Sequence, residues 1–530
     1  MCVRYAVQGK KTLFALLFFV SVLANADCGQ PGTTALHKIT IGEAVTIEAV
    51  VTGAFPGDDG LRGFYVGTES AGLFVYAPEL TAEQSPKAGE RWRLNAVAGQ
   101  YRGQKQLQQV KQLQFCGKEA LPPALLSFTH GLPDFAQYKD RLVHIEQPLT
   151  IADTYLLGRY GSLGLALNGR AFAPNTGVQG GQLLDLVLDD GRYQRDARPV
   201  PFLDAQGVRR AGDELTEVTG ILTRAFGQWR IHPIAPPQFR STNPRPEPLP
   251  EWSGIRAVNF NVKNYFIDLG SRGANTKAEF NRQKQRLAES LHLLDADILA
   301  LHEIQNKPAA VDDLLALLNA NQSAEQHYAA ARLDRRPAAI RSVIFYRPAR
   351  LTKVAVEQQV DSIHPRDPIA AMFHDQHGNP LLVIAAHYKS RGGCPEVGDI
   401  NRGEGCWAER RHGQSLALVD WLTPWLAEDV PLLVLADFNA HAQETAIRLL
   451  QEAGLIDLLA AHVPAEQRYT YSFRGQAAYL DYALASPALL EQISNVALWP
   501  INADEPAYLA KEGQSVWRAS DHDPIVIDLR

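Results

Sequence analysis

The hydrophobic pattern of the chain changes near residue 250. Before that point, apolar and polar positions alternate in short stretches separated by Gly, Pro and Asp, as in EAVTIEAVVTG at 43–53 and DLVLDDG at 185–191. Alternation with a period of two predicts half-buried β-strands. After that point, compact apolar runs alternate with helical periodicity. This predicts an all-β first half and an α/β second half whose strands are buried on both faces.

A weak repeat divides the first half. AGERWRLNAVAGQYRGQKQL begins at Ala88, and AGDELTEVTGILTRAFGQWRI begins 123 residues later at Ala211. Each segment reads as a strand, a glycine, an aromatic residue and a second strand, so we expect small β-domains at 27–120 and 125–240. OB-type barrels fit best, although other antiparallel meanders share the pattern. Core packing is the ordinary role of the aromatic residues on these candidate strands, namely Tyr101, Phe226 and Trp229.

The second half shows helices between apolar runs. Residues 277–294 place Phe280, Leu287, Leu291 and Leu294 on one helical face, and 411–426 is a second helix candidate. The runs between them are IRAVNF, DILALH, SVIFY, LLVIAA, PLLVLA and PIVIDL. The four prolines of STNPRPEPLPEW, at 241–252, predict a stiff, exposed linker before a domain at 253–530.

The N-terminus has the pattern of a cleavable export signal. A basic segment at 1–11 precedes an apolar run at 12–24, and Ala24-Asn25-Ala26 supplies the small residues of a cleavage site. The apolar run is too short for the alternative, a membrane anchor. We therefore expect residues 1–26 to be removed and the protein to be secreted or periplasmic in a bacterium. No later run of about 18 apolar residues occurs, so no stable membrane association is expected.

Four cysteines remain after that cleavage. An even number in an exported protein favours disulfides, and none has the C-x-x-C spacing of a zinc site. Their positions favour two pairs, although the sequence does not prove the pairing: Cys28–Cys116 and Cys394–Cys406.

Composition and charge narrow the functional classes. Hydrophobic residues are 46% and charged residues 21% of the 530 positions, which excludes disorder, collagen-like repeats and coiled coil for most of the chain. The formal net charge is −6. A chain this acidic is not a passive nucleic-acid coat. It would act on a polyanion through a local basic site or a bound metal.

Polar residues follow several of the apolar runs where each strand should end. In a layered α/β fold these ends meet at one rim, where carboxylates, amides and histidines can hold a hard cation and transfer protons. A single polar residue at such a position would be ordinary, since polar residues commonly begin loops. Here five strand ends carry polar residues of this kind: Asn261, Glu303, His387, Asp437-Phe438-Asn439 and Ser520-Asp521-His522.

These residues lie within motifs of a known superfamily. Seven motifs resemble, in order, the motifs of the endonuclease/exonuclease/phosphatase superfamily with the DNase I-like fold. They are FNVKN, LHEIQN, VIFYRP, AHYKS, LADFNA, YLDYALAS and SDHDP. The resemblance covers 253–530 and implies a four-layered α/β sandwich. The INADEP motif, which begins at Ile501, and the loop between Cys394 and Cys406 are similar to segments of bacterial extracellular nucleases. In those proteins OB-like barrels commonly precede the nuclease domain.

The resemblance implies a metal-dependent site. Glu303 would be the principal ligand of Mg²⁺ or Mn²⁺, helped by Asn261 and Asp521, and a role for Ca²⁺ stays open. Asp437 and Asn439 would orient the attacking water and a phosphate oxygen.

Two histidines would complete the chemistry. His522 would be polarised by Asp481, and His387 would contact the scissile phosphate and help protonate the leaving oxygen. An acid that usually pairs with the His387 equivalent is missing from 336–340. Phosphate contacts are expected from four cations, although a solvated surface position is as ordinary for each: Arg347, Lys389, Arg391 and Arg411.

The leading hypothesis is a secreted metal-dependent nuclease acting on extracellular DNA, with RNA as a further substrate. The same residues also serve phosphatases and sphingomyelinases, and a non-catalytic nucleic-acid binder is the alternative from another class. Endonuclease or exonuclease action, strand preference and oligomeric state stay open, and no protein partner is evident.

Overall fold

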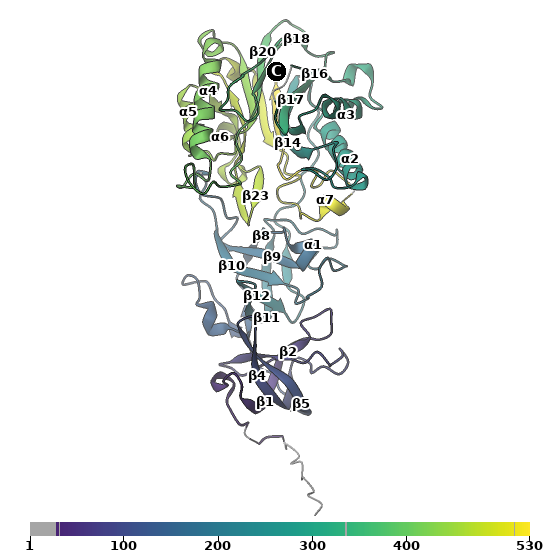
Figure 1. Ribbon diagram of the computed structural model, residues 1–530, viewed down its shortest axis with the longest axis vertical. Helices are drawn as coiled ribbons and strands as arrows, with labels where there is room; N and C mark the ends of the chain where they lie inside the picture. The colour runs from purple at the N-terminus through teal and green to yellow at the C-terminus, as the bar shows by residue number, and fades with distance from the viewer. Residues whose placement is uncertain (1–27, 31, 334–336, 514) are drawn as a thin grey trace, which may run out of the picture.

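The computed structural model describes residues 28–30, 32–333, 337–513 and 515–530. The expected export signal at 1–26 therefore lies outside the described residues. The molecule is elongated, and its β-rich first half and α/β second half follow one another along the long axis (Figure 1). No helix in the described ranges is long and apolar enough to cross a membrane.

The first β-structure is a closed five-stranded barrel with strand order β1-β2-β3-β5-β4. Alternate side chains point inward, so Val45, Ile47 and Leu94 are buried in one core with Phe64. The strands are β1 (Ala44–Phe55), β2 (Gly63–Gly67), β3 (Gly72–Tyr76), β4 (Glu90–Tyr101) and β5 (Gln104–Lys118).

The second β-region repeats this plan inside an eight-stranded sheet. Five of its strands close a ring in the same relative order as the first barrel, through the pairings β8–β9, β9–β10, β10–β12, β12–β11 and β11–β8. The third and fifth strands of each ring run parallel. The elements are β6 (Ala124–Leu125), β7 (Arg141–Ile145), β8 (Leu149–Asp153), α1 (Leu157–Tyr160), β9 (Ser162–Leu167), β10 (Gln182–Asp189), β11 (Glu214–Ala225), β12 (Gln228–Pro233) and β13 (Gln238–Arg240). The two sequence repeats form the β4–β5 and β11–β12 hairpins.

The second half contains two six-stranded sheets packed face to face. Their orders are β16-β17-β15-β14-β27-β26 and β18-β19-β20-β21-β25-β22. The first comprises β14 (Ile255–Tyr265), β15 (Ile298–Gln305), β16 (Ala329–Ala331), β17 (Ile340–Tyr346), β26 (Ile493–Leu498) and β27 (Ile525–Leu529). The second comprises β18 (Thr352–Gln358), β19 (Ile369–His374), β20 (Pro380–His387), β21 (Leu432–Asp437), β22 (Ile456–Asp457) and β25 (Asp481–Ala485).

Helices cover the outer face of each sheet, which makes four layers (Figure 1). The face of α2 that carries Leu287 and Leu291 packs on the first sheet, and the core between the sheets contains Ala300, Ile384 and Leu435. The helices are α2 (Lys277–Leu294), α3 (Pro308–Asn319), α4 (Ala408–Ala427), α5 (Thr445–Glu452), α6 (Leu458–His462) and α7 (Leu509–Glu512); a short hairpin is formed by β23 (Tyr471–Phe473) and β24 (Gln476–Ala478). The predicted helix at 277–294 is confirmed as α2.

The proline-rich segment at 241–252 is anchored rather than free. Arg245 donates two hydrogen bonds to Glu505, at 2.9 and 2.7 Å, and Asn243 donates one to Asp504 at 2.7 Å. Trp252 Nε1 donates to the carbonyl of Leu529 at 2.9 Å. The segment thus holds the second β-region against the α/β half.

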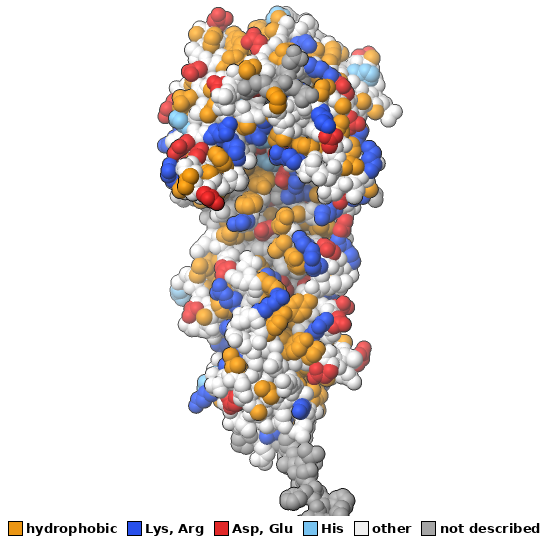
Figure 2. Space-filling view, in the orientation of Figure 1, with side chains coloured by type: hydrophobic (Ala, Val, Ile, Leu, Met, Phe, Trp, Pro, Cys, Tyr) orange, Lys and Arg blue, Asp and Glu red, His pale blue; other side chains and the backbone are white. Residues whose placement is uncertain are grey.

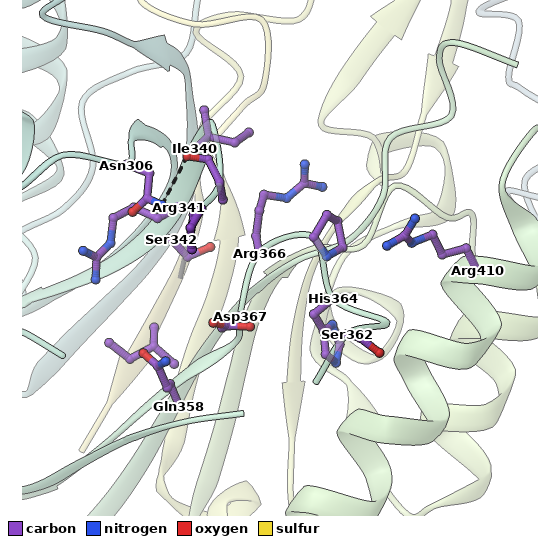
Figure 3. A pocket seen from close by; sticks show the side chains of 14 residues that line it. Asn306, Ile340, Arg341, Ser342, Gln358, Ser362, His364, Arg366, Asp367 and Arg410 are labelled. Atoms are coloured by element: carbon purple, nitrogen blue, oxygen red, sulfur yellow. Dashed lines mark hydrogen bonds between the residues drawn. The ribbon is translucent and has the colours of Figure 1, made fainter. Parts of the chain in front are cut away.

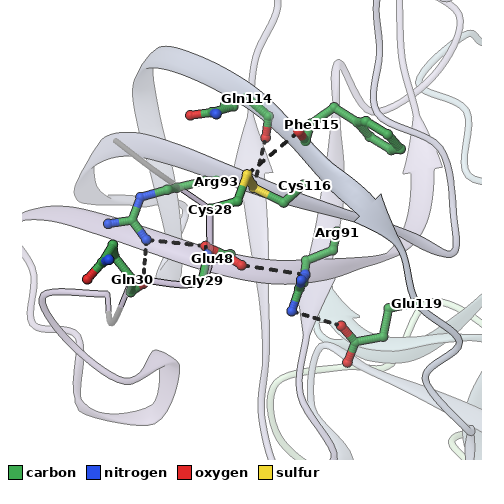
Figure 4. The surroundings of a disulfide bond; sticks show 10 residues. All are labelled: Cys28, Gly29, Gln30, Glu48, Arg91, Arg93, Gln114, Phe115, Cys116 and Glu119. Atoms are coloured by element: carbon green, nitrogen blue, oxygen red, sulfur yellow. Dashed lines mark hydrogen bonds and ion pairs between the residues drawn. A yellow bond between two sulfur atoms is a disulfide. The ribbon is translucent and has the colours of Figure 1, made fainter. Parts of the chain in front are cut away.

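Two disulfides join the predicted cysteine pairs, Cys28–Cys116 and Cys394–Cys406. The first ties the start of the described chain to β5, beside the buried pair Arg93–Glu48 (Figure 4). Disulfides of this kind indicate an oxidising compartment.

Removing the first disulfide is expected to destabilise the N-terminal barrel. The bond spans 88 residues, and loss of such a constraint costs about 2–5 kcal/mol of unfolding free energy. We expect the Cys28→Ser/Cys116→Ser variant to unfold at lower denaturant while retaining hydrolysis of a small phosphodiester. Unchanged denaturation curves under oxidising conditions would contradict this expectation.

Candidate active site

Strand register brings the predicted site residues to one rim of the sandwich. His387 lies opposite Asp437 on the parallel pair β20–β21, and Asp437 lies opposite Asp481 on β25. Asn261 on β14 lies opposite His302 on β15 in the other sheet. The carboxyl ends of parallel strands share one edge, so residues far apart in the sequence become neighbours there.

A carboxylate–imidazole pair lies at this rim. His522 Nδ1 is 2.7 Å from Asp481 Oδ2, which also accepts a hydrogen bond from Thr470 Oγ1 at 2.5 Å. The ring of Tyr471 covers His522, with centroids 4.7 Å apart. Burial alone would lower the pKa of His522, but the charge and hydrogen bond of Asp481 outweigh it and raise this pKa to about 10. His522 is therefore a cation at neutral pH, and Nε2–H is its second hydrogen-bond donor.

Asp437 lies at the centre of the polar cluster. Its Oδ2 accepts from Asn261 Nδ2 at 2.9 Å, and its Oδ1 accepts from the backbone N–H of Asn439 at 3.0 Å. Burial, and then the charge of Asp481, raise the pKa of Asp437 to about 7. A carboxyl group with that pKa can take up a proton at neutral pH.

Local irregularities in two strands aim further oxygen donors at the same place. Glu303 has a positive φ of 69°, where the register of β15 shifts, and its Oε2 accepts from the N–H of Asn264 at 2.9 Å. Bulges of this kind redirect a side chain, and strained backbone concentrates at functional sites. Asp521 is 3.2 Å from Lys263 Nζ, and Asn261 Oδ1 accepts from the N–H of Lys263 at 3.0 Å.

This donor set fits a hard divalent cation. Carboxylates and an amide converge, and oxygen atoms of Asp437 and Asp481 lie within 4.8 Å of one another, beside the cationic His522. Asp481 Oδ1 is buried without a hydrogen-bond partner among the described residues. Burial first, and then the negative charges of Asp481 and Glu303, raise the pKa of Asp437. Oxygen-rich, anionic surroundings are those that Mg²⁺ and Mn²⁺ prefer.

His387 lies on the same rim in different surroundings. It is buried, its Nε2 is 3.4 Å from Asp437 Oδ2, and its Nδ1 has no hydrogen-bond partner in the described part of the chain. Burial, followed by the charge of Arg366, lowers the pKa of His387 well below its usual value. A neutral imidazole can donate an N–H to phosphate or Asp437, but it is a poor source of a proton for a leaving oxygen. This disfavours the proton-donating role expected from the sequence.

Two predicted phosphate contacts do not reach the rim. Arg347 follows the last residue of β17, at the opposite end of the sheet, and pairs with Asp295 at 2.7 Å. Arg411 is wholly buried and donates to the carbonyls of Cys406 and Glu404, both at 2.7 Å. Arg411 therefore holds the disulfide loop, and neither arginine has the predicted role.

The other two predicted cations lie closer to the site. Arg391 donates to both carboxylate oxygens of Glu444, at 2.7 and 2.8 Å, and lies 3.4 Å from the carbonyl of Asn439. Lys389 follows His387 and stacks over Trp407, with Nζ 4.7 Å from the ring centroid. Both can approach a bound phosphate, although Arg391 is already paired.

A basic pocket beside His387 was missed by sequence reasoning. It has a volume of about 350 Å³, and Arg366 lies in it between Arg341 and Arg410 (Figure 3). Arg366 Nε donates to the carbonyl of His387 at 3.0 Å. In the sequence, the charged HPRDP segment before an apolar strand indicates this pocket. Only the fold shows that the segment borders the rim.

The second β-region supports the rim directly. The segment after β9 pairs with β24, since Ala173 donates to and Ala171 accepts from the backbone of Ala477, at 2.9 and 2.8 Å. Arg170 lies over the ring of Tyr469 at 4.4 Å and is 2.8 Å from Asp504. Tyr469 precedes Thr470, which donates a hydrogen bond to Asp481, so contacts run from the β-region to the Asp481–His522 pair.

The INADEP motif receives these contacts. Its Asp504 and Glu505 are buried, and Arg210 lies 3.0 Å from Glu505, while Tyr469 donates to Asp504 at 2.8 Å. The recess at this junction is surrounded by Lys and Arg side chains on the face shown in Figure 2. The motif therefore joins the β-region to the active half.

Truncation near Pro250 is expected to impair the site. It would remove Arg170, Arg210 and Arg245, the ion-pair partners of Asp504 and Glu505, and expose the junction in which these two carboxylates are now buried. Loss of these contacts is expected to lower both stability and turnover, which thermal unfolding and kcat would measure.

A point variant separates support from substrate binding. Arg170→Ala in the full chain is expected to lower stability and kcat, whereas replacement of the exposed Arg159 by alanine should change neither. A stable truncated enzyme with unchanged kcat would contradict the supporting role.

Comparisons with known proteins give one family match and several remote structural likenesses. No curated protein matches the chain. The catalytic domain of human Nocturnin with bound sulfate is 18% identical, covers 52% of this chain and 93% of its own, and has a TM-score of 0.37. Humanized D. rerio TDP2 is 16% identical, covers 52% of this chain and 99% of its own, and has a TM-score of 0.39. A Bacteroides thetaiotaomicron mannosyl-6-phosphatase is 13% identical, covers 52% of this chain and 99% of its own, and has a TM-score of 0.37.

These structural likenesses are too remote to indicate a substrate. The family match is more direct, because it spans residues 258–522, half of the chain, and includes the described rim from β14 to His522. The chain belongs to the Endonuclease/Exonuclease/phosphatase family.

Proposed function

We propose that this protein is an exported, metal-dependent phosphodiesterase that hydrolyses nucleic acid, DNA in the first place. The observation that carries the proposal is the convergence of the Asp481–His522 pair with Asp437, Asn261 and Glu303 at one rim. Two disulfides support export to a secreted or periplasmic location.

The proposed chemistry follows from the protonation states. Asp437, with its raised pKa, accepts the proton of the attacking water at a carboxylate oxygen, and the side chain of Asn439 helps hold that water. His522 donates Nε2–H to a phosphate oxygen as negative charge develops there, while Asp481 fixes its tautomer. The water oxygen attacks phosphorus and forms the new P–O bond, the bond to the leaving oxygen breaks, and the departing alkoxide takes up a proton from solvent.

Glu303, Asn261 and Asp521 would hold the divalent cation. Bound there, the cation would supply Lewis-acid stabilisation of phosphate and leaving-group charge. Lys389 and Arg391 would add positive potential around the diester, while neutral His387 would hydrogen-bond Asp437 or a phosphate oxygen.

The β-rich half supports a polymeric substrate over a small phosphate ester. We propose that both β-structures are OB-like barrels, because each closes a ring in the order 1-2-3-5-4 with a parallel pair between the third and fifth strands. Barrels of this class present open faces to oligonucleotides.

The function can be tested on four substrates in parallel. Purified mature protein should degrade plasmid DNA with Mg²⁺, and comparison with RNA, sphingomyelin and an inositol phosphate defines the substrate class. Asp437→Asn serves as the matched control for contaminating nuclease. Hydrolysis confined to sphingomyelin or the inositol phosphate would overturn the proposal and favour the lipid phosphodiesterase or phosphatase alternative. Nucleic-acid binding without cleavage would favour a non-catalytic binder.

A further inference from the structure

The two repeated hairpins meet in a groove between the barrels. Each hairpin turns through two residues with positive φ, Arg102-Gly103 between β4 and β5 and Phe226-Gly227 between β11 and β12. The guanidinium of Arg102 lies 5.3 Å from the ring centroid of Tyr101 and 5.8 Å from that of Phe226. The groove therefore joins equivalent parts of the two halves of the sequence repeat.

Aromatic side chains line this groove without being buried. Tyr101 is 51% exposed, Tyr193 49% and Phe226 66%, whereas Trp229 in the neighbouring strand is only 8% exposed and packs in the core. The groove has a volume of about 330 Å³, and an adjoining hollow of about 440 Å³ shares these three exposed rings and Arg102. Large apolar faces left open in this way mark a binding surface.

The groove is also locally basic in an acidic protein. Its walls carry six cations and two acids, and one acid, Asp189, is neutralised by Arg230 and lies 3.1 Å from His232. Arg102, Lys105 and Arg224 form no salt bridge with a carboxylate in the described ranges. The whole chain has a net charge of −6. This local excess of positive charge is complementary to a polyanion. The six cations are Arg62, Arg102, Lys105, Arg192, Arg224 and Arg230.

We propose that this groove binds a single-stranded segment of polynucleotide. The bases would stack on Tyr101, Phe226 and Tyr193, and phosphates would contact Arg102 and Arg224. Aromatic rings interleaved with arginines bind unpaired strands of any sequence, because every base has a flat face to stack. A duplex hides those faces within its own stack, so the groove selects unpaired strands.

The groove is a second site, distinct from the catalytic rim. It lies at the junction of the two β-structures, whereas the rim adjoins the other end of the second one (Figure 1). The choice of ligand rests on the proposed function, because both involve nucleic acid. The predicted consequence is that a long strand is held at the groove while another part of it reaches the rim.

Binding can be measured without hydrolysis. Fluorescence anisotropy of a labelled thymidine oligonucleotide of about twelve residues would be followed with full-length mature protein in EDTA. In the test variant Tyr101→Ala/Phe226→Asn, asparagine is chosen because it tolerates the φ of 54° at position 226. Loss of one stacked base costs about 1–3 kcal/mol, so Kd should rise about tenfold or more. The control Tyr155→Ala removes a ring that is 67% exposed outside the groove and should leave Kd unchanged.

Two results would overturn the inference. Either the double variant binds the oligonucleotide as tightly as the wild type, or the wild type binds a duplex of equal length as tightly as the single strand. Hydrolysis of bis(4-nitrophenyl) phosphate, a substrate too small to span both sites, should be the same in the variant and the wild type. If wild-type protein binds the single strand but hydrolyses no phosphodiester with Mg²⁺, the groove stands and the proposed function fails.

Discussion

Replacing His522 with alanine is expected to lower kcat for phosphodiester hydrolysis by about 100-fold or more. The substitution removes the imidazolium that Asp481 stabilises and that donates Nε2–H to a phosphate oxygen in the proposed chemistry. Loss of a positioned acid–base group typically costs a factor of about 10²–10⁴. Thermal stability should fall as well, because the substitution leaves the buried Asp481 without its cationic partner, so kcat is compared at a temperature where both proteins are folded.

A matched variant distinguishes this effect from a general loss of folded protein. His377 is exposed in the turn between β19 and β20, at the opposite end of β20 from His387, and His377→Ala should retain wild-type kcat. His387→Ala should have a smaller effect than His522→Ala, because the imidazole of His387 is neutral. Wild-type kcat in the His522→Ala enzyme would remove the assigned role of the Asp481–His522 pair.

Removal of divalent cations is expected to abolish hydrolysis, and Mg²⁺ or Mn²⁺ should restore it. The buried Asp437 and Asp481, together with Glu303, leave negative charge that repels a phosphodiester unless a cation offsets it. A catalytic metal supplies several kcal/mol of transition-state stabilisation, which corresponds to a rate loss of about 1000-fold or more without it.

The ligand assignment has its own test. Glu303→Gln keeps the shape of the side chain but removes its charge, so the Mg²⁺ concentration for half-maximal activity should rise while the fold remains intact. Zn²⁺ should not be the preferred activator, because the donors are mainly oxygen atoms. Full cleavage after exhaustive dialysis against EDTA would disprove the metal requirement.

Local pattern was enough to predict the main elements and most of the rim. The helix at 277–294 follows from apolar spacing and a Thr276 cap that accepts from the N–H of Glu279. The polar residues that end the apolar runs do meet at one rim, because parallel strands align their carboxyl ends. The cysteine pairs also followed from position in the chain, since each brackets one segment.

The roles of individual charged and aromatic residues were less predictable. Arg347 was expected at a phosphate, but its position after β17 puts it at the far end of the sheet with Asp295. Tyr101 and Phe226 were expected in barrel cores, yet hairpin turns place both in an open groove, whereas Trp229 is buried as expected. Residue type alone does not distinguish these environments.

Local sequence is sufficient to predict which segments become strands and helices, since periodicity and capping act over a few neighbouring residues. Which distant residues share the same surroundings depends on how those strands and helices pack. Arg170 and Asp504 are 334 positions apart, and no local preference encodes their contact. The pKa values of Asp437 and His522 likewise depend on burial and on charges brought by other strands. Electrostatic environment is a property of the assembled rim, because it sums desolvation and Coulomb interactions over groups that only folding makes adjacent.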